Sequence, residues 1–378
     1  MRLFLVIYFL VYGGLHLHAF LKAKAALAFG VAVGIPLALF MLTMILAPIV
    51  VRYSERFGLD LFARIMANIG FVWGGILFLF FSASIVLDLY RLVIYVFGLI
   101  FQADTSSFVP SARHSFYAPL FLSVSIFVYG YYEANSIRTE RLAIKSHKIP
   151  AENSPLKIVQ ISDVHLGLIV REGRLNRILD KVRSEHPDIL VSTGDLVDGQ
   201  ICKLNGLEDL LREIRPRYGK FAVTGNHEFY AGFDNARCFT ENAGFTLLRG
   251  QATSVAGITI AGVDDPVGRM SGLAKDISEK ELLLPLSREK FILFLKHRPL
   301  LDENAVGLFD LQLSGHIHKG QIFPFTLITS LYYRITSGRL ELPNNTLMYV
   351  SRGSGTWGPP IRFLAPPEVT VIELIHGN

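Results

Sequence analysis

The hydrophobic residues of this chain follow two different patterns, one before about residue 135 and one after about residue 155. In the first part, apolar residues run almost without interruption over residues 3–21, 25–51, 65–101 and 117–132. A helix that crosses the hydrocarbon core of a bilayer needs about 20 such residues. The pattern therefore predicts about four transmembrane helices. We expect them at residues 3–21, 27–50, 66–87 and 115–133.

The segment 89–101 leaves the number of membrane crossings open. It follows two charges, Asp88 and Arg91, that interrupt the third apolar run. The segment either extends the third helix, lies in the membrane interface or turns back into the helix bundle. Asp88 and Arg91 are three residues apart, so they would share one helix face and are expected to neutralise each other.

The second pattern is an alternation of short apolar runs with amphipathic stretches, which is typical of an α/β fold. Strands are predicted at residues 156–161, 188–192, 220–223, 257–262, 291–294, 309–313, 346–350 and 369–374, and helices at 172–185 and 207–214. So many strands suggest two packed sheets flanked by helices. The polar and basic residues 136–155 are predicted to be a linker. The chain would then consist of a transmembrane region at 1–135, the linker 136–155 and a second domain at 156–378.

Composition supports a membrane protein and argues against some other classes. Hydrophobic residues make up 51% of the chain and charged residues only 18%, below the quarter that is usual for a water-soluble domain. The formal charge of +5 is too mild to indicate nucleic-acid binding, and no nucleic acid is expected as a partner. Cys202 and Cys238 cannot build a disulfide framework, and their spacing fits no zinc motif.

Lysine and arginine are unevenly divided between the two sides of the predicted membrane region. With four spans, one side carries eight of these residues and the other three, if Arg91 is left aside. The eight are Arg2, Arg52, Arg56, Arg64, Arg138, Arg141, Lys145 and Lys148. Because positive loops stay on the cytoplasmic side, both termini and the second domain are expected in the cytoplasm. A fifth span at 89–101 would reverse that side.

Candidate metal ligands follow five of the predicted strands, at the point where each strand ends. Loops at the edge of a sheet can bring such side chains together. Seven residues in these loops carry a carboxylate, an amide oxygen or an imidazole. They are Asp163, His165, Asp195, Asn226, His297, His316 and His318.

These ligand types suit manganese, iron or zinc, because no thiolate is present to favour copper or an iron–sulfur cluster. Seven ligands are more than one tetrahedral ion needs. They would serve two divalent ions if one carboxylate bridged them. Two neighbouring metals are the arrangement used for displacement at phosphorus. Manganese is the expected metal, with iron or zinc as alternatives.

The order of these motifs resembles the calcineurin-like metallophosphoesterase superfamily. The motifs are D-x-H, G-D-x-x-D, G-N-H-E, a lone histidine after a strand, and G-H-x-H, and they span residues 163–318. The C-terminal "HKGQIFPF", "YVSRGSGTWGPPIRFLAPPE" and "VTVIEL" resemble the branch of small bacterial membrane-associated phosphoesterases. The resemblance does not cover the first 135 residues. It implies a four-layer αββα sandwich with metals at the sheet edges.

The resemblance also implies a role for each residue. Asp163, His165 and His318 would hold one metal, and Asn226, His297 and His316 the other, with Asp195 bridging them. A water shared by the two ions would be the nucleophile. His227 would be a catalytic group that stabilises or protonates the departing oxygen, with Glu228 orienting its ring.

Residues outside the ligand set keep two interpretations at this point. Asp198 either supports the Asp195 loop or is a solvated loop carboxylate. Arg352 and Arg362 either bind an anionic substrate or form surface ion pairs. Lys319 departs from the small residue common in the family and either contacts phosphate or points into solvent. The substrate-binding residues are not assigned by the sequence.

The leading hypothesis is a membrane-anchored, dinuclear metal-dependent phosphoesterase in the bacterial inner membrane. It would hydrolyse a phosphodiester, pyrophosphate or phosphomonoester. The apolar stretch "QIFPFTLITSLYYR" (321–334) directly follows the H-x-H ligands and favours a lipid-linked substrate. The alternatives are a phosphodiesterase acting on soluble nucleotides and a non-catalytic membrane sensor that keeps a degenerate hydrolase fold.

Overall fold

The computed structural model of the chain describes residues 2–199, 204, 206–275 and 277–377. The predictions about Cys202 therefore fall outside the described residues. The chain divides into two compact units. The first is Met1–Tyr131 with Gly358–Ile361, and the second is Tyr132–Trp357 with Arg362–Asn378.

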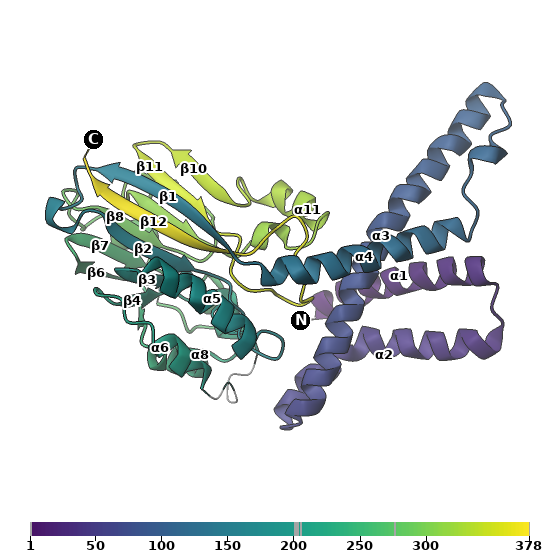
Figure 1. Ribbon diagram of the computed structural model, residues 1–378, viewed down its shortest axis with the longest axis horizontal. Coiled ribbons are helices and arrows are strands. Elements are labelled where there is room, and N and C mark those ends of the chain that lie inside the picture. The colour runs from purple at the N-terminus through teal and green to yellow at the C-terminus, as the bar shows by residue number, and fades with distance from the viewer. Residues whose placement is uncertain (1, 200–203, 205, 276, 378) are drawn as a thin grey trace. The chain divides into compact units, whose positions relative to one another are not determined.

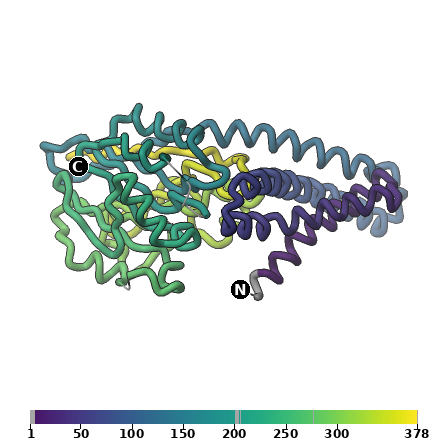
Figure 2. The backbone as a smooth tube through the Cα atoms, turned by 90° about the horizontal axis from the view of Figure 1, so that it is seen from below, coloured from purple at the N-terminus to yellow at the C-terminus, as the bar shows by residue number. Residues whose placement is uncertain are grey.

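Long helices account for most of the described N-terminal residues (Figure 2). They are α1 (Arg2–Leu27), α2 (Val31–Arg56), α3 (Asp60–Phe101) and α4 (His114–Asn135), with a short 3₁₀ turn η1 (Ser106–Phe108) before α4. Three of them, α1 from Leu5 onward, α2 and α3, are long and apolar enough to cross a membrane. The predicted span at 115–133 is a helix, but α4 is not among these three candidates within the described residues.

Helix α3 resolves the uncertainty about segment 89–101. It runs without a break over 42 residues, so residues 89–101 extend the third helix. At 1.5 Å per residue the helix is about 63 Å long, roughly twice the thickness of the hydrocarbon core. It ends where Gln102 adopts a left-handed conformation with φ of 50°.

The predicted pairing of Asp88 with Arg91 is wrong. Asp88 instead forms an ion pair with Lys22 of α1, across the helix bundle. Both side chains are partly buried, with side-chain exposures of 15% for Lys22 and 35% for Asp88. A charge on an apolar helix is costly unless a partner faces it. A pattern along one helix cannot show which neighbouring helix supplies that partner.

The second unit contains two six-stranded mixed sheets in its described part (Figure 1). The first sheet has the order β1 (Arg138–Ser146), β12 (Glu368–His376), β2 (Leu156–Ile161), β3 (Ile189–Ser192), β4 (Lys220–Ala222) and β5 (Thr246–Leu247). The second has the order β10 (Gly338–Leu342), β11 (Thr346–Val350), β9 (Leu311–Ser314), β8 (Ile292–Leu295), β7 (Ile258–Gly262) and β6 (Gln251–Val255). The predicted α/β domain with two packed sheets is confirmed.

Three apolar cores hold the layers of this unit together. One lies between the first sheet and the helices α5 (Glu172–Glu185), α6 (Leu207–Arg212) and α8 (Phe233–Asn242). A second fills the space between the two sheets, and a third covers the other face of the second sheet. The remaining short elements are η2 (Ala151–Asn153), α7 (Asn226–Tyr230), α9 (Val267–Met270), α10 (Glu279–Leu283), η3 (His318–Gly320) and α11 (Phe325–Tyr332).

The segment predicted as the linker 136–155 contains a strand. Residues 138–146 form β1, which pairs in parallel with β12 at the edge of the first sheet. Leu142 and Ile144 are buried, whereas the alternate residues Arg141, Ala143 and Lys145 are exposed. An edge strand with a solvated face has this two-residue period. The many charges on the solvated face therefore concealed the strand.

The direction of the strands determines where the candidate ligands lie. In the first sheet, β2, β3 and β4 run parallel, with Ile158 opposite Ile189 and Leu190 opposite Lys220. In the second sheet, β8 and β9 also run parallel. The loops that leave the carboxyl ends of parallel strands meet at one edge of their sheet. These five strands are the ones after which the sequence placed the ligands.

Candidate metal centre

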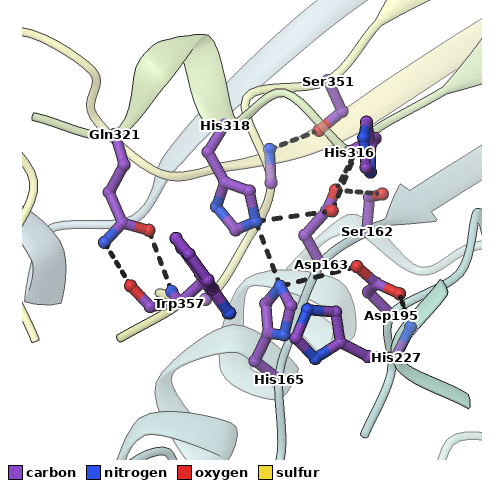
Figure 3. Close-up of polar contacts among 12 residues, drawn as sticks. Ser162, Asp163, His165, Asp195, His227, His316, His318, Gln321, Ser351 and Trp357 are labelled. Carbon is purple, nitrogen blue, oxygen red and sulfur yellow. Dashed lines mark hydrogen bonds and ion pairs between the residues drawn. The ribbon is translucent and has the colours of Figure 1, made fainter. Parts of the chain in front are cut away.

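The loops after β2, β3, β4, β8 and β9 bring most of the predicted ligands into direct contact (Figure 3). His318 Nε2 lies 3.4 Å from Asp163 Oδ1 and 3.1 Å from His165 Nε2. His297 Nε2 lies 3.2 Å from Asp195 Oδ2 and 3.1 Å from His316 Nδ1. The ligand atoms thus form two neighbouring groups.

Asp195 lies between the two groups. Its Oδ2 is 3.2 Å from His297 Nε2 and 3.8 Å from His165 Nε2. Its Oδ1 accepts a hydrogen bond of 2.8 Å from the backbone N–H of His227. A carboxylate in this position can serve both groups at once.

The backbone is strained at five of the predicted ligands. Their φ angles lie in the left-handed region, where residues other than glycine are uncommon. The values are 52° for Asp163, 55° for His165, 51° for Asp195, 75° for His316 and 51° for His318. Each such residue costs on the order of 1–3 kcal/mol, and such strain gathers at functional sites.

Two glycines allow the loops to approach closely. A Cβ at Gly225 would lie 2.2 Å from Asp195 Oδ1, and a Cβ at Gly315 would lie 1.9 Å from Ser162 Oγ. Any larger residue would separate the strand ends from each other. The glycines of the G-N-H-E and G-H-x-H motifs are therefore required by packing around Asp195 and Asp163.

The donor set fits divalent metal ions. Asp163, His165 and His318 form one group of ligand atoms, and Asp195, His297 and His316 form another. Carboxylate oxygens and imidazole nitrogens suit manganese, iron and zinc. Asn226 Oδ1 and His165 Nδ1 are buried and have no hydrogen-bond partner among the described residues. Buried polar atoms are normally satisfied, so the unpaired Asn226 oxygen fits the role of a metal ligand.

Hydrogen bonds hold the histidine rings in defined orientations. His297 Nδ1 donates to the backbone carbonyl of Thr193 at 2.8 Å, which leaves Nε2 for the Asp195 side. The buried guanidinium of Arg362 donates to His318 Nδ1 at 2.9 Å and to the carbonyl of His318 at 3.0 Å. Such outer contacts fix ligand orientation in metal sites.

The charges of the centre shift its pKa values strongly. Burial raises the pKa of Asp195, but His297 and His227 outweigh burial and hold it well below the usual range. Burial and the neighbouring His227 lower the pKa of His165 to about 3, and burial and His297 lower that of His316 to about 3. A lowered pKa favours the neutral ring that binds a metal. Burial also lowers the pKa of His297, but Asp195 outweighs burial and raises it to about 10.

His227 differs from its neighbours. Burial lowers its pKa, but Asp195 and a hydrogen bond to Asp198 outweigh burial and raise it to about 9. Its Nδ1 lies 2.8 Å from Asp198 Oδ1, and its ring centroid lies 4.6 Å from that of His165. A protonated imidazole at the edge of a metal centre can donate a proton or stabilise negative charge.

The prediction that Glu228 orients His227 is wrong. Glu228 accepts hydrogen bonds from the backbone N–H groups of Asp195 at 3.0 Å, Leu196 at 2.7 Å and Gly225 at 2.7 Å. It therefore ties the loop after β3 to the loop after β4. Asp198 orients the His227 ring instead. The family resemblance implied this role for Glu228, but adjacent residues on a helix do not face each other.

The structure also bears on Arg352 and Arg362, for which anion binding and surface ion pairs were both left open. Arg362 is fully buried, and its donors go to His318 and to backbone carbonyls that include Gly355. Arg352 pairs with Glu140 and Glu368. Neither arginine is a surface cation that awaits an anionic substrate. Aromatic rings near the centre include Trp357, whose ring centroid lies 6.4 Å from that of His227 and whose backbone N–H and carbonyl both bond to the Gln321 side chain.

Comparison with known proteins agrees with this geometry. The family model described as calcineurin-like phosphoesterase matches residues 156–320. An uncharacterised metallophosphoesterase of Aquifex aeolicus is 38% identical over 258 residues, which are 68% of this chain and 98% of that protein. The chain belongs to the metallophosphoesterase family.

Some relatives in the metallophosphoesterase family are named as transmembrane proteins. A transmembrane protein with metallophosphoesterase domain from Danio rerio is 31% identical over 68% of this chain and 61% of that protein. Among solved structures, a 5'-nucleotidase precursor from Thermus thermophilus is similar, with a TM-score of 0.36 and 17% identity over 58% of this chain and 54% of that chain. With three apolar helices of membrane-spanning length, this metallophosphoesterase is a membrane protein.

The position of Glu228 generates a prediction. In Glu228→Gln an amide nitrogen replaces one oxygen, so at least one of the three backbone N–H groups loses its acceptor. A buried donor without an acceptor costs about 1–3 kcal/mol. We expect a lower melting temperature and a lower metal content, because the loops of Asp195 and Asn226 loosen together. Thermal unfolding and elemental analysis of the detergent-solubilised protein measure both.

Glu213→Gln is the matched control, since this side chain is 63% exposed. It should leave both quantities unchanged. Wild-type melting and wild-type metal content in Glu228→Gln would show that the three hydrogen bonds do not hold the loops.

Proposed function

We propose that this protein is a membrane-anchored, two-metal phosphoesterase. The observation that carries the proposal is the shared position of Asp195 between two groups of buried or half-buried ligand residues. One group would hold a first ion through Asp163, His165 and His318, and the other a second ion through Asn226, His297 and His316. Two divalent ions supply Lewis-acid activation of water and charge neutralisation at the phosphoryl group. Manganese is the proposed metal, with iron or zinc as alternatives.

Side chains around the metal ligands have proposed roles of their own in catalysis. Asp198 would hold Nδ1 of His227, which leaves Nε2 free to face the departing oxygen of the phosphoester. The hydrogen bond to Asp198 favours the protonated form of the ring, which would deliver a proton to that oxygen. Asp163 is fixed by the Ser162 hydroxyl at 2.6 Å and by the backbone N–H of His316 at 2.9 Å. These contacts would hold the first ligand group while the substrate turns over.

A lipid-linked substrate is the proposed class. Three helices of membrane-spanning length anchor the chain to a bilayer. Helix α11 begins at Phe325, shortly after the turn His318–Gly320 that ends the ligand loop, and its large apolar side chains are exposed. A soluble nucleotide needs neither feature, and it is the competing substrate class.

The proposed location is the bacterial inner membrane, with the catalytic unit in the cytoplasm. The support is the excess of lysine and arginine on the side that carries Arg52, Arg56 and Arg64 and the segment 138–148. This orientation requires α4 to be a fourth crossing. Its 22 residues correspond to about 33 Å, enough for the hydrocarbon core.

The experiment that tests the proposed function is a substrate panel with the detergent-purified protein and Mn²⁺. We expect about two metal ions per chain. We also expect faster hydrolysis of lipid-linked pyrophosphates or phospholipids than of soluble nucleotides. Asp195→Asn should lower both metal occupancies and abolish turnover. Full metal content without turnover of any ester would instead favour the non-catalytic sensor.

His227→Ala separates chemistry from metal binding. We expect wild-type metal content and a kcat that is about 10²–10⁴-fold lower for an ester with a poor leaving group. The loss should be smaller for a nitrophenyl ester, whose leaving group needs little protonation. His147→Ala is the control, because this histidine is exposed. Empty metal sites in His227→Ala would make His227 a structural residue.

Cys238 allows a test of orientation. It lies on α8 and its side chain is exposed. In a Cys202→Ser background, we expect Cys238 to resist a membrane-impermeant maleimide in intact bacterial cells and to react after permeabilisation. Cys238→Ser gives the background signal. Full labelling of intact cells would place the catalytic unit outside the cytoplasm.

A further inference from the structure

A cavity of about 510 Å³, lined by both apolar and polar side chains, lies in the catalytic unit, outside the group of metal ligands. Its walls come from the segment after β8, the segment after α11 and the hairpin of β10 and β11. They include Leu301, Val306, Ile335, Leu340, Leu342 and Met348. This volume falls in the range of sites that bind small molecules, and such sites are mostly apolar.

The cavity reaches the edge of the metal centre. Tyr333 lines it, and the Tyr333 ring centroid lies 6.0 Å from that of His316. Pro299 also lines it and follows His297 by two residues. A molecule in the cavity would therefore have one end beside His297 and His316, which are proposed to hold the second metal ion.

Helix α11 also borders the cavity. Tyr332, the last residue of α11, lines the cavity and is 73% exposed. Leu327 and Ile328 are each 58% exposed and Leu331 is 88% exposed. None of the eight residues of α11 is buried. A helix with this much exposed apolar surface is unfavourable in water and stable at a lipid interface.

We propose that this cavity binds the apolar chain of an amphipathic phosphoester, with the phosphate at the metal centre and α11 in the lipid surface from which the chain enters. The proposal rests on the proposed phosphoesterase function. The occupant is a lipid chain because the same polypeptide carries three helices of membrane-spanning length. The exposed Arg334 lines the cavity beside Tyr333, and the exposed Glu303 lines it as well, so the cavity carries one charge of each sign; the positive one is suited to lipid phosphates.

Two variants of one residue test the cavity. Leu340→Trp fills it, and Leu340→Ala widens it; neither residue change touches the metal ligands. The substrates are two phosphodiesters that release the same alcohol and differ only in the group that stays on the phosphate, which is a short soluble chain in one and a long alkyl chain, presented in detergent micelles, in the other. The readout is the ratio of kcat/KM for the long ester to kcat/KM for the short ester. This ratio cancels any loss of folded enzyme.

We expect Leu340→Trp to lower this ratio about tenfold or more, mainly through KM, because displacing even two buried methylene groups is enough for that loss. Leu340→Ala should raise the preference for the long chain or leave it unchanged. Leu284→Trp is the matched control at a 58% exposed leucine that does not line the cavity, and it should keep the wild-type ratio. A wild-type ratio in Leu340→Trp would overturn the proposal.

A second substitution tests α11 with substrate presented in a bilayer. Leu331→Glu should lower turnover of the long ester in vesicles and leave turnover of the short soluble ester unchanged. Equal turnover of the vesicle substrate by Leu331→Glu and wild type would show that α11 does not lie in the lipid surface.

Binding of non-hydrolysable phosphonates separates this inference from the proposed function. A wild-type protein that cleaves neither ester but binds the long-chain phosphonate more tightly than the short one would refute the phosphoesterase and keep the chain-binding cavity. Equal affinity for both chain lengths would refute the cavity as a chain-binding site.

Discussion

The cost of burying charge without compensation is the constraint on which the site depends. Asp195 is 2% exposed and Asp163 is fully buried, and a carboxylate in such surroundings needs positive charge or hydrogen-bond donors around it. Part of the compensation comes from the backbone N–H of His227 and from the His297 ring. The close approach of these groups requires glycines at 225 and 315 and left-handed backbone at five ligands. The two sheets supply the rigid frame that keeps this strain in place.

Much of the frame and nearly all of the candidate ligands can be predicted from the sequence. A buried parallel strand is a short apolar run, and a candidate ligand that follows it is marked by its residue type. Asp195, Asn226 and His316 also directly follow a glycine. The strand at 156–161 and the helix at 172–185 therefore begin and end where the pattern places them. The membrane helices are recognisable because their apolar runs are long, although α3 continues well past the predicted end.

The features that the sequence does not reveal are those decided by neighbours in space. The strand β1 exposes one face to solvent, so its charges suggested a linker. Asp88 pairs across the bundle with Lys22, and His227 is oriented by Asp198 and not by the adjacent Glu228. For Asp88 and His227, the residue type indicated a charged partner, but only the packing of separate elements determines which partner is within reach. Arg362 is the extreme example, since a surface role was one of its two interpretations and it is fully buried against His318.

The segment after the H-x-H ligands connects the chemistry to the membrane character of the chain. His316 and His318 follow β9, and within a few residues the same segment forms α11 and part of the wall of the cavity. A rigid ligand loop and an exposed apolar helix are thus parts of one continuous stretch. Tyr333 borders both His316 and the cavity. A substrate chain bound in the cavity would therefore fix how far the substrate phosphate lies from the metal ligands. The same aromatic side chain would then influence both the chain length that the enzyme accepts and the position of the phosphate.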